Sequence, residues 1–216
     1  MIKIYANIFM WYNKYMKKFA FIDVQNTETT TLKVLKFIVC HEKLFSFLKN
    51  DWGCEDIFFY PGIQKGDETR DEIFSRLTKI GAIVRAKYYL VYKNEDKIIS
   101  TKCPKCDTQI TQQVNMGNSW KCNCDVELTM DVLTKASVDT EIVLFTGDGD
   151  FELLIKEIVS RGSKVTIVSS AKKQQKGLRY STSRLSTKLR NLTEEKGSPV
   201  RFLELDNLKF RINKEI

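Results

Sequence analysis

Four aspartates occupy positions from which acidic side chains can bind one metal ion together. Asp148 and Asp150 follow an apolar run that ends at Thr146, Asp23 lies near the end of another apolar run, and Asp125 begins a helical pattern. In parallel α/β sheets, ligands bind just beyond the carboxyl ends of the strands. We therefore expect these four carboxylates to meet at one edge of a sheet.

Carboxylates held this close together need protons or a cation. Two unit charges ~4 Å apart repel by about 4 kcal/mol at an effective dielectric constant near 20. Hard oxygen ligands favour Mg²⁺ or Mn²⁺, and such an ion can activate water and stabilise charge on a phosphate. The pattern predicts metal-dependent cleavage of phosphodiesters. The alternative for Asp148 and Asp150 alone is a turn that caps the following helix.

The elements that would position these acids alternate between strands and helices. Apolar runs predict strands at 19–24, 55–60, 82–92, 141–146 and 164–170. Helical spacing predicts helices at 30–51, 67–81, 125–137 and 150–162, then a basic helix at 177–192 before a last strand at 200–208. The fold class is α/β, with a parallel sheet flanked by helices on both faces.

Composition limits the classes of function. The chain has 216 residues, 43% hydrophobic, which suffice for one core with a small appendage. The net charge of +8 favours an anionic partner, nucleic acid first, although solubility alone is an alternative explanation. We expect residues 1–18 to be an N-terminal extension, no membrane span and a cytoplasmic protein.

Four cysteines form a pattern typical of a zinc site. Cys103 and Cys106 are separated by 15 residues from Cys122 and Cys124 within a polar insert at 93–124. A hairpin that brought both pairs together would supply four thiolates to a closed, structural Zn²⁺ site. Because the second pair directly precedes Asp125, we expect this zinc-ribbon-like insert to fix the start of the helix that carries it.

Three segments together resemble the NYN domain, a branch of the PIN-like nuclease superfamily. They are "FIDVQN", "CDVELTMDVL" and "VLFTGDGDFELLIKEIVSRGSKVTIV". The resemblance implies a Rossmann-like parallel sheet, an acidic site for a divalent metal and, for many members, ribonuclease activity. It covers residues 19–170, the expected NYN/PIN-like nuclease domain, and we expect 171–216 to complete the domain.

The resemblance also implies roles for individual residues. Asp23, Asp125, Asp148 and Asp150 match the acidic metal-binding set, which makes them the expected catalytic residues. Asn26 matches a polar position just past the first strand, where it would orient a water or a phosphate oxygen.

Further positions are expected to support this set. Asp131 also matches the family, but it lies six positions after Asp125 and so on a different helix face, where it would act only indirectly. Thr146 and Gly147 are expected to bring backbone N–H groups near the acids. His41, the only histidine, is not expected to act as a general base.

A basic segment follows the fifth predicted strand. Lys172, Lys173, Lys176 and Arg179 would lie beside the acids and hold a phosphate backbone without reading its sequence. The alternative is a solvated helix face.

These observations predict a metal-dependent endoribonuclease that cleaves RNA, with DNA as an alternative substrate and the oligomeric state, including a homodimer, left open. A rival hypothesis is a non-catalytic RNA- or DNA-binding module with a structural zinc. A phosphatase is the least favoured reading, because Asp23 is followed by "VQN" and no second acid stands two residues later.

Overall fold

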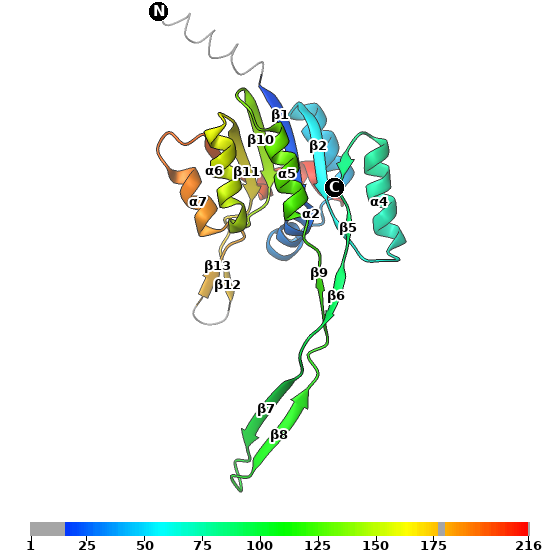
Figure 1. Ribbon diagram of the computed structural model, residues 1–216, viewed down its shortest axis with the longest axis vertical. Coiled ribbons are helices and arrows are strands. Elements are labelled where there is room, and N and C mark those ends of the chain that lie inside the picture. Colours follow the sequence, from blue (N-terminus) through cyan, green and yellow to red (C-terminus); the bar gives the residue numbers. More distant parts are fainter. Residues whose placement is uncertain (1–15, 177–179, 216) are drawn as a thin grey trace, which may run out of the picture.

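A six-stranded parallel sheet forms the centre of the computed structural model, which describes residues 16–176 and 180–215. The strand order is β14-β11-β10-β1-β2-β4, as Figure 1 shows. In that order the strands are Val200–Glu204, Lys164–Ser169, Thr140–Phe145, Lys17–Asp23, Cys54–Tyr60 and Ile83–Val84. The predicted α/β class with a parallel sheet is confirmed.

The two central strands are buried on both faces. In β1, Phe19 and Phe21 belong to one hydrophobic core, while Ala20 and Ile22 belong to the other. Side chains of successive strand residues point to opposite faces, so a strand between two helical layers must be apolar throughout. This explains why the sequence shows continuous apolar runs here rather than alternation.

Helices cover both faces of the sheet (Figure 1). On one face lie α5 (Asp125–Lys135), α6 (Glu152–Ser160) and α7 (Thr187–Glu194), whose buried leucines and isoleucines contribute to one core. On the other lie α3 (His41–Ser46), α4 (Glu68–Lys79) and α8 (Lys209–Ile212). No helix in the described ranges is long and apolar enough to traverse a bilayer.

The single helix predicted over 30–51 is wrong. The chain forms α2 (Val24–Thr29), a π-helix η1 (Thr30–Leu35), and then α3 and a π-helix η2 (Phe47–Asp51) after a break. The break begins at Lys36, which has a left-handed φ of 59°. It places Phe37 and Val39 in the core, and that burial outweighs the local helical spacing.

The basic helix predicted over 177–192 is also wrong in its first half. Strands β12 (Gln174–Lys176) and β13 (Tyr180–Thr182) form an antiparallel hairpin, and the helix α7 begins only at Thr187. Ser186 caps this helix, because its hydroxyl accepts a hydrogen bond from the N–H of Leu189. The hairpin projects from the carboxyl edge of the sheet (Figure 1).

The segment predicted as one strand at 82–92 divides into three. Only β4 joins the central sheet, while β5 (Lys87–Tyr88) pairs with β3 (Gly62–Ile63) and β6 (Leu90–Lys93) pairs with β9 (Asn118–Lys121). Farther out, β7 (Lys97–Lys102) pairs with β8 (Gln109–Val114). We call residues 90–121 the β-arm; it extends far from the carboxyl edge of the sheet (Figure 1).

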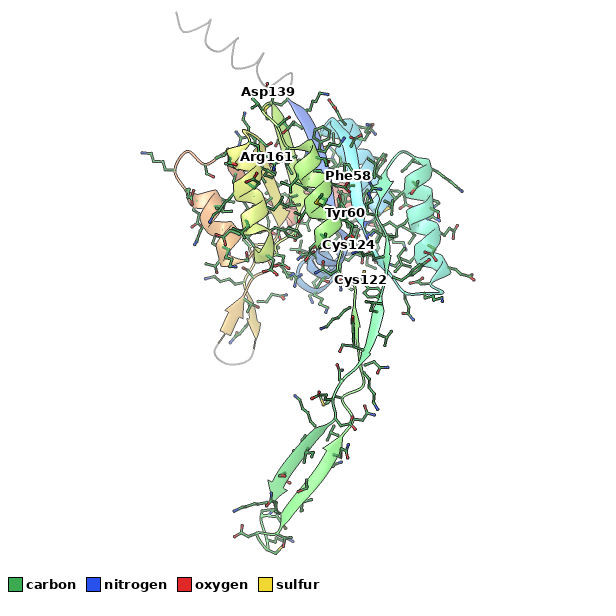
Figure 2. All side chains as sticks on the ribbon, viewed as in Figure 1. Phe58, Tyr60, Cys122, Cys124, Asp139 and Arg161 are labelled. Carbon is green, nitrogen blue, oxygen red and sulfur yellow. The ribbon has the colours of Figure 1, made fainter. Side chains whose placement is uncertain are left out.

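The β-arm keeps the two cysteine pairs apart. Cys103 and Cys106 lie in the turn that joins β7 to β8, at the tip of the arm, whereas Cys122 and Cys124 follow β9 where the chain re-enters the α/β domain (Figures 1 and 2). The expectation that a small hairpin brings both pairs together is therefore not met. The reason is that the 15-residue gap forms an extended ladder instead of folding back.

Candidate metal-binding cleft

A cleft of about 310 Å³ opens at the carboxyl edge of the sheet. Three of the four expected acids line it from three different elements: Asp23 from the end of β1, Asp125 from the start of α5, and Asp148 from the loop after β10. Asn26, Tyr60 and Arg184 line it as well. Parallel strands end at the same edge, so the fold brings together residues that are more than 100 positions apart in sequence.

Asp23 is held at both carboxylate oxygens. Its Oδ1 accepts a hydrogen bond from the N–H of Asn26 at 3.0 Å, which caps α2, and its Oδ2 accepts one from Thr146 Oγ1 at 3.2 Å. These bonds fix the carboxylate between the ends of β1 and β10.

The surroundings of Asp23 disfavour its charged form. Burial, together with the nearby charges of Asp125 and Asp148, raises the pKa of this carboxyl from its ordinary value of 3.8 to about 6. The hydrogen bonds from Asn26 and Thr146 oppose this rise without cancelling it. A divalent cation bound here would offset the repulsion between the carboxylates and stabilise the charged form of Asp23.

The other three aspartates belong to the same electrostatic group. Burial raises the pKa of Asp125, and the charges of Asp148 and Asp150 raise it further. The Oδ1 of Asp148 accepts a hydrogen bond from the N–H of Asp150 at 3.0 Å and begins the short 3-10 helix η3 (Gly149–Phe151). Asp150 does not line the cleft but lies close enough to act on Asp125.

Thr146 and Gly147 link the loop after β10 to other residues of the cleft. The N–H of Asp148 donates to Thr146 Oγ1 at 3.2 Å, and the N–H of Gly147 donates to Asn26 Oδ1 at 3.3 Å. A Cβ on Gly147 would lie 2.2 Å from the backbone oxygen of Arg184, so only glycine fits at this position.

Asp131 is not in the cleft. Its Oδ2 accepts hydrogen bonds from the Tyr60 hydroxyl at 3.0 Å and from Arg85 Nε at 3.2 Å. Burial, followed by the charge of Asp131, raises the pKa of Tyr60, so the phenol stays neutral. Asp131 is therefore linked to the cleft through Tyr60, which is one of the lining residues.

Lys172 and Lys173, which were predicted to lie beside the acids, are not among the residues that line the cleft. Lys172 forms an ion pair with Asp206 at 2.6 Å, Lys173 is exposed, and Lys176 ends β12. Arg179 lies outside the described residues.

Arg184 is the cationic side chain that sequence reasoning missed. It lines the cleft, and its Nε donates to Thr30 Oγ1 at 3.2 Å. In the described part of the chain it has no acidic partner. The basic composition of 171–190 was the only signal in the sequence, and it did not single out this residue.

His41 has a structural role. It is buried, and its Nε2 lies 2.9 Å from Glu28 Oε1, which also pairs with Arg70. It is not among the residues that line the cleft.

Carboxylate oxygens are the ligands that a hard divalent cation prefers, but the side chains that carry them are not gathered around one point. Within residues 16–176 and 180–215, no group of three or more histidine, cysteine or acidic side chains lies close enough together to hold a metal ion. The four carboxylates nonetheless act on one another through space, and their mutual repulsion is what a divalent ion would relieve. Oxygen ligands of this kind fit Mg²⁺ or Mn²⁺.

Comparison with known proteins identifies the family. Residues 19–187, well over half of the chain, match the NYN domain. The low amplitude and bright protein LabA of Synechococcus elongatus is 36% identical over 70 residues, which are 32% of this chain and 38% of LabA, so the chain spans well under half of that relative.

One solved structure has a similar fold. The crystal structure of a protein of unknown function from Vibrio parahaemolyticus has a TM-score of 0.58 with 20% identity, covering 89% of this chain and 95% of that one. Phosphofructokinase-2 from Escherichia coli aligns with a TM-score of only 0.35 and 12% identity, over 72% of this chain and 55% of that one, and contributes nothing to the interpretation.

Proposed function

We propose that this chain, which belongs to the NYN domain family, is a metal-dependent endoribonuclease. The observation that carries the proposal is that Asp23, Asp125 and Asp148 line one cleft, where burial and mutual repulsion raise the pKa values of the first two. Charged carboxylates that are partly buried and close to one another destabilise the fold unless a cation binds them. Such clusters of carboxylates with shifted pKa values are typical of functional sites.

Asp23, Asp125, Asp148 and Asp150 would hold Mg²⁺ or Mn²⁺. When bound, the ion would supply a hydroxide nucleophile at neutral pH and charge stabilisation for the phosphorane-like transition state. The protein's contribution is to hold the carboxylates in place. Thr146 and the N–H of Asn26 fix the oxygens of Asp23, and the turn at Asp148 fixes the second side of the cleft.

Substrate contacts would come from polar and cationic groups around the acids. Arg184 reaches the cleft and would bind a phosphate oxygen next to the scissile bond. Lys173 and Lys176 of the basic segment would contact phosphates farther along the RNA chain without reading its sequence. The β-arm and the β12–β13 hairpin both project from the carboxyl edge (Figure 1), so RNA would pass between them over the cleft.

The proposal is tested by cleavage of end-labelled single-stranded RNA and a matched DNA. We expect the RNA to be cut at internal positions in Mn²⁺ or Mg²⁺, to remain intact in EDTA, and to be cleaved faster than the DNA. If the protein binds RNA but produces no fragments with any divalent metal, the nuclease proposal is wrong and the hypothesis of a non-catalytic RNA-binding module is favoured. Fragments formed equally in EDTA would exclude the metal-dependent site.

A further inference from the structure

The tip of the β-arm is a hydrogen-bonded turn that carries two free cysteines, of which Cys106 is exposed and Cys103 half-buried. Cys103 and Cys106 flank Pro104 and Lys105. The turn is closed by backbone hydrogen bonds from the Cys103 N–H to the Thr108 oxygen at 2.9 Å and from the Asp107 N–H to the Cys103 oxygen at 3.0 Å. These bonds fix the backbone of the segment that carries both cysteines.

Cys106 has a defined neighbour in this turn. The Sγ of Cys106 lies 3.2 Å from Thr108 Oγ1. Outer contacts of this kind orient a sulfur ligand before the metal arrives.

The pair is half of a metal site. Structural zinc takes four ligands in a tetrahedron, and two thiolates leave two positions open. The other two cysteines cannot fill them within one chain, because Cys122 and Cys124 lie at the base of the arm. Their sulfurs already contact the α/β domain, with Cys122 Sγ 3.5 Å from the Lys87 oxygen and Cys124 Sγ 3.8 Å from the Arg85 oxygen.

We propose that one Zn²⁺ joins the arm tips of two copies of this chain, each copy supplying Cys103 and Cys106. A two-fold axis through the metal would complete the tetrahedron with identical halves and close the assembly as a dimer. Figure 1 shows the tip as the part of the chain farthest from the α/β domain, so two tips meet without contact between the domains.

Charge and stability both agree with this arrangement. A zinc ion with four thiolates carries a net charge of about −2, and the exposed Lys102 and Lys105 of each copy place positive charge beside it.

The arm itself is a two-stranded ladder with Ile98 and Ile110 exposed, and such hairpins are marginally stable alone. A metal that binds only the folded turn would stabilise it.

The experiment measures zinc content and mass on the full chain, purified with a phosphine reductant. Bound zinc is quantified by mass spectrometry, and the molar mass by light scattering after gel filtration, with and without added Zn²⁺ and after chelation. We expect one zinc per two chains and a dimer that chelation returns to monomer. Co²⁺ in place of Zn²⁺ should give the intense thiolate charge-transfer bands of a four-sulfur site.

Two double variants locate the ligands. The variant Cys103→Ser with Cys106→Ser should lose both the zinc and the dimer, whereas Cys122→Ser with Cys124→Ser should keep both. One zinc per chain in a monomer, lost in either variant, would overturn the proposal in favour of a four-thiol site within one chain. A zinc-dependent dimer that needs both pairs, or a dimer broken by reductant and not by chelator, would overturn it as well. None of these readouts depends on nuclease activity.

Discussion

The side-chain oxygen of Asn26 accepts a hydrogen bond from the backbone N–H of Gly147, 3.3 Å away and 121 positions later in the sequence. This bond joins the ends of β1 and β10, the two central strands of the sheet. The same residue donates its own N–H to Asp23. Asn26 therefore couples the acid on one strand to the turn that carries the acid on the next.

Replacement of Asn26 by alanine should separate these two halves of the site. We expect the Asn26→Ala variant to cleave RNA at least about 10-fold more slowly, because Gly147 loses its acceptor and the turn before Asp148 becomes less fixed. The free energy of unfolding should fall by only about 1 kcal/mol, the usual contribution of one such hydrogen bond. Single-turnover cleavage and urea denaturation measure the two effects.

Asn50→Ala is the matched control, because Asn50 is exposed on η2. It should leave both quantities unchanged. Full cleavage by Asn26→Ala would mean that the tie between the strands does not matter for the site.

Replacement of Asp148 by asparagine removes one charge while keeping the side-chain shape. We expect the Asp148→Asn variant to lose at least about 100-fold in cleavage rate in saturating Mn²⁺, because a neutral amide is a poor ligand for a hard cation. The fold should be intact by circular dichroism, since the amide oxygen can still accept the hydrogen bond from the Asp150 N–H.

Asp139→Asn provides the control for that charge change. Asp139 lies at the opposite edge of the sheet, as Figure 2 shows, and has a left-handed φ of 68° that asparagine also tolerates. This variant should cleave at the wild-type rate. Equal cleavage by the two variants would remove Asp148 from the catalytic set.

The sequence was sufficient for the parts of the molecule that local pattern determines. The strands β1, β10 and β11 and the helices α4, α5 and α6 lie where apolar periodicity predicts them. The meeting of Asp23, Asp125 and Asp148 was also predictable, because parallel strands share one carboxyl edge.

Other features depend on contacts between distant segments, which no local pattern contains. The break at Lys36 exists because the core accepts Phe37 and Val39. Arg184 reaches the cleft only because its backbone crosses over Gly147. Cysteine spacing alone does not reveal whether the chain between two pairs folds back or extends as a ladder.

The raised pKa of Asp23 predicts how stability changes with pH in metal-free protein. The folded-state pKa is about 6 against an ordinary value of 3.8, so the folded state binds more protons between these values. This stabilising contribution is complete below about pH 4 and is lost as the pH rises through 6, a loss of about 2–3 kcal/mol at most. Urea denaturation in EDTA from pH 4 to pH 7.5 measures it.

The Asp23→Asn variant should lack this contribution. It should be more stable than the wild type at pH 7 and lose less stability between pH 4 and pH 7, because an amide needs no proton to remain neutral. If the free energy of unfolding changes equally with pH in both proteins, the pKa of Asp23 is not raised in the metal-free fold.

Replacement of Gly147 by alanine should disturb both the turn and the segment above it. The added Cβ would lie 2.2 Å from the Arg184 oxygen and 2.5 Å from Ser169 Oγ. Because one of these neighbours is backbone, the chain must shift, and we expect a loss of about 1–3 kcal/mol in stability together with most of the cleavage activity.

Gly149→Ala serves as the comparison for that change. Its Cβ would lie 2.9 Å from Ser186 Oγ, a side-chain atom that can rotate away. Rotation would weaken the cap that Ser186 Oγ provides for α7, a cost of about 1 kcal/mol, but no backbone has to shift. We therefore expect a loss of stability at the lower end of that for Gly147→Ala, measured by the midpoint of thermal unfolding. Equal stability of Gly147→Ala and the wild type would contradict the close approach of these two segments.

Replacement of Arg184 by alanine tests the contact proposed for the substrate phosphate. A charge-assisted hydrogen bond to phosphate contributes about 1.5–3 kcal/mol, so KM for RNA should rise about 10- to 100-fold while the free energy of unfolding changes little. Arg184→Lys should recover part of the loss, because it restores the charge without the planar guanidinium. Arg161→Ala is the matched control: Arg161 pairs with Glu157 at 2.9 Å and lies toward the opposite edge of the sheet (Figure 2). A KM for Arg184→Ala equal to that of Arg161→Ala would place the phosphate contact elsewhere on the cleft.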